Sequence, residues 1–357
     1  MQNNNSQKLN RIQGLDLIRA FAIICVFIVH ILDASRTGYS IEDYHNLSTF
    51  SKIFFFLFYT IGRFGVPLFF FLTGYLLMHR DYNSENTKKF YRHNFLTLLV
   101  TWEIWIPIYN WIAWWYYDVS FHTSTLIKNM FFIEPVYVLT TWYMPVILGI
   151  YLFIPYVSRV LKSMNYQELL PILLVAYVYF FIIPTIYHLK SNTSQFSVVL
   201  DLKFSGGLYG FYVILGYLIR IYGHYLEKLS NLTVIITILI STALITLAQI
   251  WVTEKSLYLV WYDFFLQPIV TVLIFNYLKS FKFDKFSGLI LNISNYSFGM
   301  YLIHIIFIFI ILKYGLLDFI AINELKMIIG FLITFILSFI SIMFIKKLPY
   351  LGKILVR

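Results

Sequence analysis

The chain alternates long runs of apolar residues with shorter polar segments. Ten of these runs are long enough to cross the hydrocarbon core of a membrane, which takes roughly 20 helical residues. The pattern therefore predicts an all-α polytopic membrane protein with about ten transmembrane helices. The runs cover approximately residues 15–32, 52–78, 95–117, 139–157, 169–187, 206–222, 231–252, 259–279, 296–313 and 325–345.

The second run, 52–78, is too long for one upright transmembrane helix. Gly62, Gly65 and Pro67 interrupt it, and glycine and proline are the usual causes of sharp helix kinks. We therefore expect a kinked or broken helix in this part of the chain.

Composition agrees with a membrane location, and the positions of the cations indicate the topology. The chain is 60% hydrophobic and only 12% charged, with a mean hydropathy of +0.75, far from the values of soluble domains. Its net charge of +10 does not require a nucleic-acid partner, because 17 of the 27 Lys and Arg residues fall at the two termini and in every second connection between them. The other connections hold only 8. This bias predicts a multi-pass protein of the cell membrane, surrounded by lipid, with both termini cytoplasmic and no nucleic-acid partner.

The N terminus allows two interpretations. Residues 1–10 are rich in Gln and Asn and predict a short disordered tail. The apolar run that follows could be a cleaved signal peptide, but it contains Asp16 and Arg19, and no small-x-small cleavage site follows it. We therefore expect the run to remain in the protein, and residues 1–357 to form a single integral-membrane domain.

The first apolar run carries three ionisable side chains, those of Asp16, Arg19 and His30. An ionisable group inside a membrane costs roughly 2.5–3.5 kcal/mol on insertion scales, so each one needs a partner or a function. Arg19 and His30 differ by only about 20° around a helix and lie roughly 16 Å apart along it. Asp16 lies within about 40° of His30 by the same geometry. We therefore expect this helix face to contact protein and not lipid.

Two further groups of cations interrupt the apolar pattern. Arg63 lies between Gly62 and Gly65, where it is either a snorkelling arginine at the outer interface or a functional one; the glycines favour function. The inner loop 79–94 is the densest basic segment and contains Arg92. Most such segments only anchor the topology, and because this one lacks a Gly-rich phosphate motif, side chains would have to hold any anion.

Ser297, Tyr301 and His304 in the ninth run follow one another at i, i+4 and i+7, so they share one helix face. A second histidine within a membrane span is more often a hydrogen-bonded packing residue than a catalyst, and both interpretations stay open. We expect no metal site, because Cys25 is the single cysteine and no histidine pair has the spacing of metal ligands.

Four stretches together resemble the acyltransferase type-3 family of membrane proteins. Each stretch alone is weakly specific, but the four occur in the family's order across about 290 residues. Two departures are visible: Thr73 replaces the usual serine of the second block, and no second arginine follows three positions after Arg92. The stretches are Leu15 and Asp16 with Arg19 and His30, residues 64–75, residues 141–143 with Tyr151 and Pro155, and residues 297–304.

The resemblance implies a membrane acyltransferase. The chain is more similar to the stand-alone members, which O-acetylate surface polysaccharides or their lipid-linked precursors. The expected partners are cytosolic acetyl-CoA as acyl donor and a hydroxyl of a carbohydrate or lipid-linked sugar as acceptor. The sequence carries no motif that identifies the acceptor.

The resemblance also suggests roles for individual side chains in acyl transfer. Transfer from a thioester to a sugar hydroxyl needs a base, and a nearly neutral imidazole suits that task near pH 7. His30 is the expected base, although it could instead carry the acyl group as a nucleophile, and the sequence does not separate the two routes. Arg63 is the leading candidate for the donor to the oxyanion, with Tyr301 and His304 behind it.

Donor binding is expected at the cytosolic end of the same helix. Arg19 could hold the anionic or carbonyl end of the acyl-CoA arm while the thioester reaches toward His30. Asp16 could orient Arg19 through an i, i+3 pair, and Arg92 is a further candidate for binding the donor.

Two other classes of function share several of these features. Ten spans, a broken helix and buried charges are also expected of a secondary transporter or polysaccharide exporter. However, the pattern of Asp16, Arg19 and His30 has no counterpart in the second half of the chain, so no inverted repeat supports that interpretation. A sensor that binds sugar or lipid without turnover is neither supported nor excluded.

Overall fold

The computed structural model describes residues 13–35, 41–190, 200, 202, 206–256, 262–282, 287–349 and 351–356. The predicted disordered tail, 1–10, lies outside these residues. Within the described ranges the chain is largely helical and has no β-strand, which confirms the all-α fold class. The α-helices are α1 (Gln13–Ser35), α2 (Ile41–Asn46), α3 (Thr49–Gly62), α4 (Gly65–Leu77), α5 (Ser84–Phe90), α6 (Leu96–Tyr117), α7 (Thr123–Met130), α8 (Tyr143–Ser163), α9 (Tyr166–Tyr177), α10 (Ile183–Lys190), α11 (Gly207–Tyr222), α12 (Asn231–Ser256), α13 (Leu266–Lys279), α14 (Ser287–Lys313), α15 (Asn323–Ile345) and α16 (Leu351–Leu355).

The described part of the chain contains eight helical segments that are long and apolar enough to cross a membrane, which confirms a polytopic membrane protein. Two of them are composite: α3 and α4 form Thr49–Leu77, and α9 and α10 form Tyr166–Lys190. The predicted runs 206–222 and 259–279 correspond to the shorter helices α11 and α13, of 16 and 14 residues. A helix of 14 residues extends only about 21 Å, so α13 by itself is shorter than the hydrocarbon core.

The segment 79–94, predicted as an inner loop, is largely helical. The side-chain oxygen of Asn83 accepts a hydrogen bond from the backbone N–H of Asn86 at 2.8 Å and thereby caps the start of α5. The chain then continues through a π-helical turn, Tyr91–Phe95, into α6. The prediction of a loop was wrong because apolar character marks the part of a helix within the membrane, and not the point at which the helix begins.

The predicted break in the second run is confirmed, and it lies against α1. α3 ends at Gly62 and α4 begins at Gly65. A Cβ atom on Gly62 would lie 2.5 Å from a methyl group of Val29, and one on Gly65 would lie 2.6 Å from the carbonyl oxygen of Ala22. Only glycine therefore allows the broken segment to approach α1 this closely, which places Arg63 beside the first helix.

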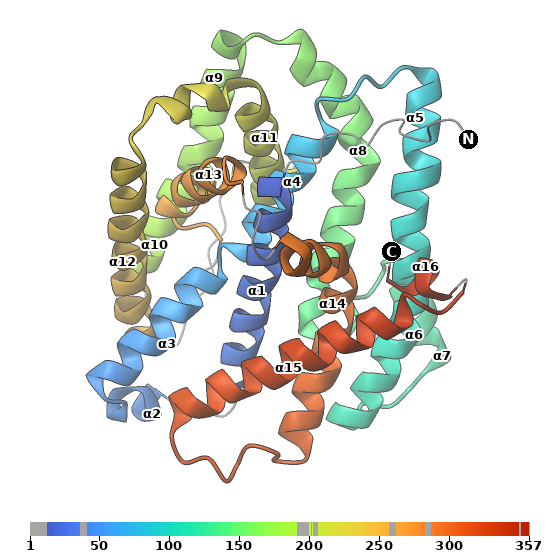
Figure 1. The fold of residues 1–357 in the computed structure, drawn as a ribbon, viewed down its shortest axis with the longest axis vertical. Helices are drawn as coiled ribbons and strands as arrows, with labels where there is room; N and C mark the ends of the chain where they lie inside the picture. Colours follow the sequence, from blue (N-terminus) through green and yellow to red (C-terminus); the bar gives the residue numbers. More distant parts are fainter. Residues whose placement is uncertain are drawn as a thin grey trace, which may run out of the picture.

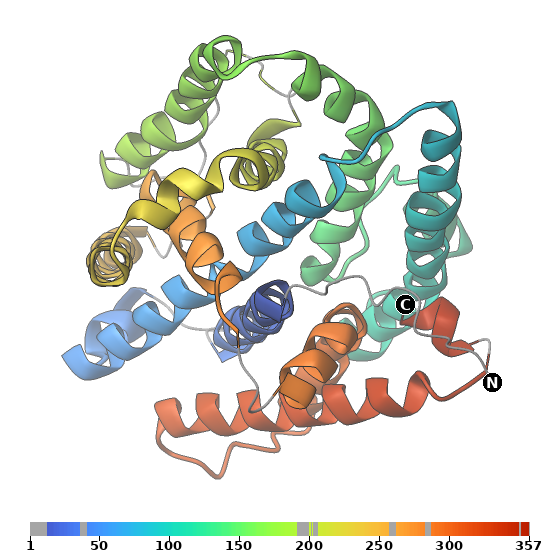
Figure 2. The ribbon, with the colours of Figure 1, turned by 45° about the horizontal axis from the view of Figure 1, so that its top comes forward.

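α1 occupies the middle of the helical assembly. It packs against α3, α4, α13, α14 and α15 (Figures 1 and 2). Of the eight long segments, α1 has the largest buried share. The expectation that its polar face contacts protein is therefore confirmed.

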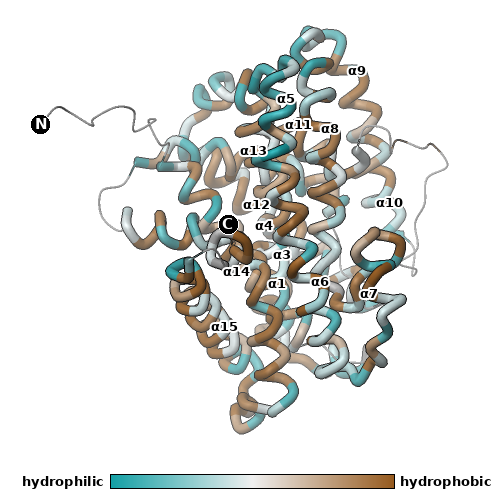
Figure 3. Tube along the Cα trace, turned by 90° about the vertical axis from the view of Figure 1, so that its right-hand side faces the viewer, coloured by the Kyte–Doolittle hydropathy of each residue, from teal (hydrophilic) through white to brown (hydrophobic). Residues whose placement is uncertain are grey.

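The connections separate between the two ends of the assembly. The start of α1, α5 and the end of α8 lie toward one end, called the α5 end below, whereas α2 and α7 lie toward the other, the α7 end (Figure 1). α5 is mostly hydrophilic, in contrast to the hydrophobic α15 (Figure 3). The segments at the α5 end are those that the cation bias predicts to be cytoplasmic.

α4 and α11 approach each other through small residues. A Cβ atom on Gly74 would lie 1.8 Å from the carbonyl oxygen of Val213, and one on Gly216 would lie 2.2 Å from that of Phe71. Backbones can come this close only where side chains are absent, as is common between membrane helices.

We expect Gly74→Ala to destabilise the protein strongly, because the added methyl group would meet the backbone of α11. Overpacking of this kind costs about 1–3 kcal/mol or more. Gly149→Ala is the matched control, since a Cβ atom there has no heavy atom within 4 Å. Thermal unfolding in detergent, followed by size-exclusion chromatography, measures both variants. Equal stability of the two would contradict the close α4–α11 contact.

The topology prediction can be tested at two connections that the structure places at opposite ends. A reporter inserted between α8 and α9, at Asn165, should lie in the cytoplasm, and one inserted before α7, at His122, should lie outside. Paired cytoplasmic and extracytoplasmic reporters at each site give the measurement. The same side for both insertions would overturn the predicted topology.

Candidate active site

The start of α1 carries an ion pair that a residue of α14 completes. The Arg19 guanidinium lies 3.0 Å from Oδ1 of Asp16, as the i, i+3 spacing predicted. The hydroxyl of Ser294 donates a second hydrogen bond to the same carboxylate oxygen at 2.8 Å. Asp16 is buried, whereas Arg19 is half-buried and keeps part of its side chain open. The pair thus fixes Arg19 without enclosing it.

The two intramembrane histidines meet at the other end of the α1–α14 contact. Nδ1 of His30 lies 2.6 Å from Nε2 of His304, and Nδ1 of His304 lies 2.6 Å from the backbone carbonyl oxygen of Tyr301. The contact with Asp16 comes earlier along both helices than the contact between the histidines, so α1 and α14 run parallel. The sequence indicated both histidines separately, and the structure joins them.

This chain of hydrogen bonds determines where the protons lie. A carbonyl oxygen can only accept, so Nδ1 of His304 carries a hydrogen and donates it to Tyr301. In the neutral ring, Nε2 of His304 is then an acceptor, and Nδ1 of His30 must donate to it. Nε2 of His30 is left with its lone pair, and among the described residues it has no hydrogen-bond partner. The arrangement presents a neutral imidazole with a defined basic nitrogen.

Arg63 is buried in the break between α3 and α4. Its guanidinium lies 4.5 Å from the centroid of the Tyr59 ring and 5.1 Å from that of Tyr262, and it donates a hydrogen bond to the hydroxyl of Tyr262 at 3.2 Å. Its backbone carbonyl, freed by the break, accepts from the side chain of Gln267 at 2.9 Å. Gly62, the residue before Arg63, lies against Val29, the residue before His30. Arg63 is therefore a fixed cation close to the histidine pair, and not a snorkelling surface residue.

Tyr301 is committed to a structural contact. Its hydroxyl donates to the backbone carbonyl of Thr140 at 3.0 Å, and its ring packs edge-on against that of Tyr143, with 5.6 Å between ring centroids. The ring centroid of His304 lies 6.0 Å from that of Tyr301. Because the hydroxyl proton is already donated, Tyr301 is less suited than Arg63 to stabilise an oxyanion.

A cavity of about 430 Å³ leads from the α5 end toward the histidines. Arg19, Arg80 and Asn94 contribute to its lining, as do Val26 on α1 and Tyr301 on α14. Val26 lies one helical turn before His30, and Tyr301 lies one turn before His304. The cavity thus extends to within about one helical turn of the histidine pair, and neither histidine is among its lining residues.

Arg92, expected to bind the donor, lies away from this cavity. It is exposed on the π-helical turn between α5 and α6 and is not among the lining residues. Arg80, four residues before α5, contributes to the lining instead. Both arginines belong to the basic segment and both are exposed, and the composition of the segment could not indicate which of them borders the cavity.

Sequence reasoning missed three partners of the site residues, namely Ser294, Tyr262 and Gln267. Each is a polar residue near the start of an apolar run. The sequence shows this, but it does not distinguish these three residues from other polar residues at similar positions. The contacts join positions about 200 to 280 residues apart, so the sequence offered no local spacing that could pair them.

Comparison with known proteins yields one family. No curated protein and no solved structure matches the chain. The family model described as an acyltransferase domain, Acyl_transf_3, matches residues 12–346, which is nearly the whole chain. This range includes the ion pair of α1, the histidine pair and the cavity between them. The chain therefore belongs to the acyltransferase-3 family of membrane acyltransferases.

Proposed function

We propose that this acyltransferase moves an acetyl group from cytosolic acetyl-CoA to a hydroxyl of a cell-surface polysaccharide or its lipid-linked precursor, at the cell membrane. The observation that carries the proposal is the hydrogen-bonded series from His30 through His304 to the carbonyl of Tyr301. It leaves one basic nitrogen in a fixed orientation, about one helical turn beyond a cavity whose lining includes Arg19 and Arg80 at the end predicted to be cytoplasmic.

The proposed reaction uses His30 as general base. Nε2 of His30 takes the proton of the acceptor hydroxyl as its oxygen attacks the thioester carbonyl, and a C–O bond forms. When the tetrahedral intermediate collapses, the C–S bond breaks and the proton passes from Nε2 to the departing thiolate. The products are the acyl ester and the free thiol, so atoms and charges balance. His304 keeps His30 in the required tautomer, because its Nε2 accepts the hydrogen bond from Nδ1 of His30.

A second route uses the same nitrogen as nucleophile. Nε2 of His30 would attack the thioester first, and the C–S bond would break to release the thiolate of CoA. The acceptor hydroxyl would then take the acyl group as the N–C bond breaks, and its proton would pass to the thiolate. Both routes develop negative charge on the carbonyl oxygen. We assign its stabilisation to Arg63, because this cation is buried, fixed by Tyr262 and placed beside the part of α1 that carries His30.

The donor is proposed to enter from the α5 end. Its uncharged arm would lie along the largely apolar wall of the cavity, with the thioester directed toward Tyr301 and the histidines. Arg19, held in place by Asp16, would contact the donor in the cavity.

The direct test uses purified protein, acetyl-CoA labelled in the acetyl group, and a glycolipid and polysaccharide extract of the host membrane. We expect label to move to a hydroxyl-bearing acceptor in an alkali-labile ester. His30→Ala should lower this transfer about 10²–10⁴-fold while the protein remains folded, because the general base is removed.

His224→Ala is the matched control, since His224 is exposed and lies outside the site. It should transfer at the wild-type rate. Activity of His30→Ala within a few fold of wild type would remove His30 from the mechanism. Movement of the acceptor across vesicles without transfer of label would instead indicate a transporter.

Arg19→Lys tests the contact with the donor. Lysine keeps the charge but loses the planar fork, so we expect the KM for acetyl-CoA to rise about tenfold while the KM for the acceptor changes little. If Arg19 only balances Asp16, the double variant Asp16→Asn with Arg19→Gln should be folded and active, because neither charge is left alone. Such an active double variant with an unchanged KM for the donor would contradict the proposed role.

A further inference from the structure

The lining of the cavity contains two arginines from different parts of the chain. Arg19 comes from α1, and Arg80 follows the end of α4. The rest of the wall is largely apolar, with aromatic rings and hydroxyl groups at intervals. Two guanidinium groups on one cavity make a site that favours an anion with more than one charged oxygen.

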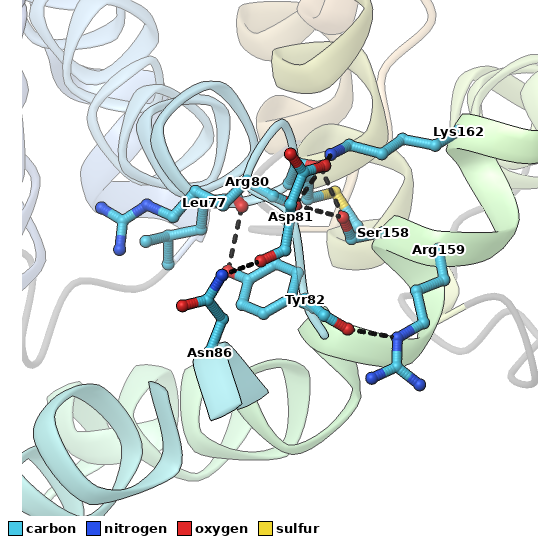
Figure 4. A network of polar contacts seen from close by, with 9 residues as sticks. Leu77, Arg80, Asp81, Tyr82, Asn86, Ser158, Arg159 and Lys162 are labelled. Atoms are coloured by element: carbon cyan, nitrogen blue, oxygen red, sulfur yellow. Dashed lines mark hydrogen bonds and ion pairs between the residues drawn. The ribbon is translucent and has the colours of Figure 1, made fainter. Parts of the chain in front are cut away.

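The turn that carries Arg80 is fixed by side chains of α8. The hydroxyl of Ser158 donates to the carbonyl of Met78 at 2.6 Å, and the ammonium group of Lys162 donates to the carbonyl of Arg80 at 2.9 Å. Arg159 donates to the carbonyl of Tyr82 at 2.6 Å. These carbonyl groups of the turn after α4 are thus satisfied, which orders the turn (Figure 4).

The side chain of Arg80 is free to bind a ligand. It extends away from Lys162 (Figure 4), and its Nε donates to the carbonyl of Leu76 at 3.0 Å. Its two terminal nitrogens make no hydrogen bond or ion pair with any other described residue. Lys162, by contrast, is paired with Asp81 at 2.5 Å. Of these two cations, Arg80 is the one that keeps donors for a ligand in the cavity.

The neighbourhood of Arg80 is electropositive. Burial and then the positive charge of Arg220 lower the pKa of His79, and Arg80 and Lys162 add to this effect. His79 is therefore neutral at pH 7 and adds no charge to those of Arg80, Lys162 and Arg220. An anion entering the cavity would meet a positive field before it reached the apolar wall.

We propose that Arg80 and Arg19 together bind the diphosphate of the acyl-CoA donor. The proposal rests on the proposed function and assigns to Arg80 the anion recognition that the sequence suggested for Arg92. The diphosphate would lie between the two guanidinium groups, and the uncharged arm would continue along the apolar wall toward Tyr301. A bidentate guanidinium contact suits phosphate oxygens better than an ammonium group does.

The test measures binding without catalysis. Free CoA, dephospho-CoA and pantetheine are titrated into the full-length protein in lipid-free detergent by calorimetry. Pantetheine lacks the diphosphate, and dephospho-CoA keeps it but lacks the 3′-phosphate. We expect Arg80→Gln to weaken binding of CoA and of dephospho-CoA at least about tenfold and to leave pantetheine unchanged. Arg80→Lys should weaken both less.

Arg92→Gln is the matched control, because Arg92 is a cation of the same segment that does not line the cavity. Its affinity for all three ligands should equal that of wild type. A loss with Arg92→Gln and none with Arg80→Gln would overturn the proposal, as would an equal loss for pantetheine. A role of Arg80 in binding phospholipid head groups would also leave CoA affinity unchanged in detergent and would overturn it.

The outcome separates this proposal from the proposed function. If wild-type protein binds neither CoA nor dephospho-CoA, then acetyl-CoA is not the donor and both proposals fail. If wild type binds CoA and Arg80→Gln binds it equally well, the donor assignment stands and only the role of Arg80 is rejected.

Discussion

The structure depends on the need to satisfy ionisable groups on a helix that lies inside the protein and inside the membrane. Asp16 and His30 on α1 are each met by a side chain of α14, the first by Ser294 and the second by His304. An unpaired group of this kind is costly where water is excluded. The parallel packing of α1 and α14 is therefore fixed at two points along the helices, by the contact of Asp16 with Ser294 and by that of His30 with His304. The geometry of the candidate active site follows from that packing.

The broken second span depends on the same central helix. Gly62 and Gly65 let the chain approach the backbone of α1, and the break leaves the carbonyl of Arg63 to be satisfied by Gln267. The guanidinium is held in turn by Tyr262. Packing at the break and the contacts with Tyr262 and Gln267 thus fix a buried arginine from several sides within the candidate active site.

The cavity joins the two functional ends of α1. Its lining includes arginines near the α5 end and Tyr301 near the histidines, so a long ligand with a charged head and an uncharged arm matches its chemistry. The ordered turn after α4 matters because a cation binds an anion well only where its backbone is already fixed. Under the proposed function, donor recognition and acyl transfer would take place at different depths of the same site.

The sequence by itself determined the features that depend on local pattern. Apolar runs predicted the membrane helices, glycines predicted the break at residues 62–65, and helical periodicity placed Asp16, Arg19 and His30 on one face. These features follow from the composition and spacing within a single helix, which neighbouring residues decide. The four family-like stretches also identified the family, because they preserve order along the chain.

Only the tertiary structure decided which of these groups meet. The pairing of His30 with His304 joins positions 274 residues apart and depends on the relative rotation and depth of α1 and α14. Whether Arg80 or Arg92 lines the cavity depends on where α4 ends and on the rotation of α5 about its own axis. A shift of one residue turns a helical side chain by about 100°, so small differences in packing decide which side chains face the cavity. Such rotations are set by contacts between helices, and no spacing along the sequence records them.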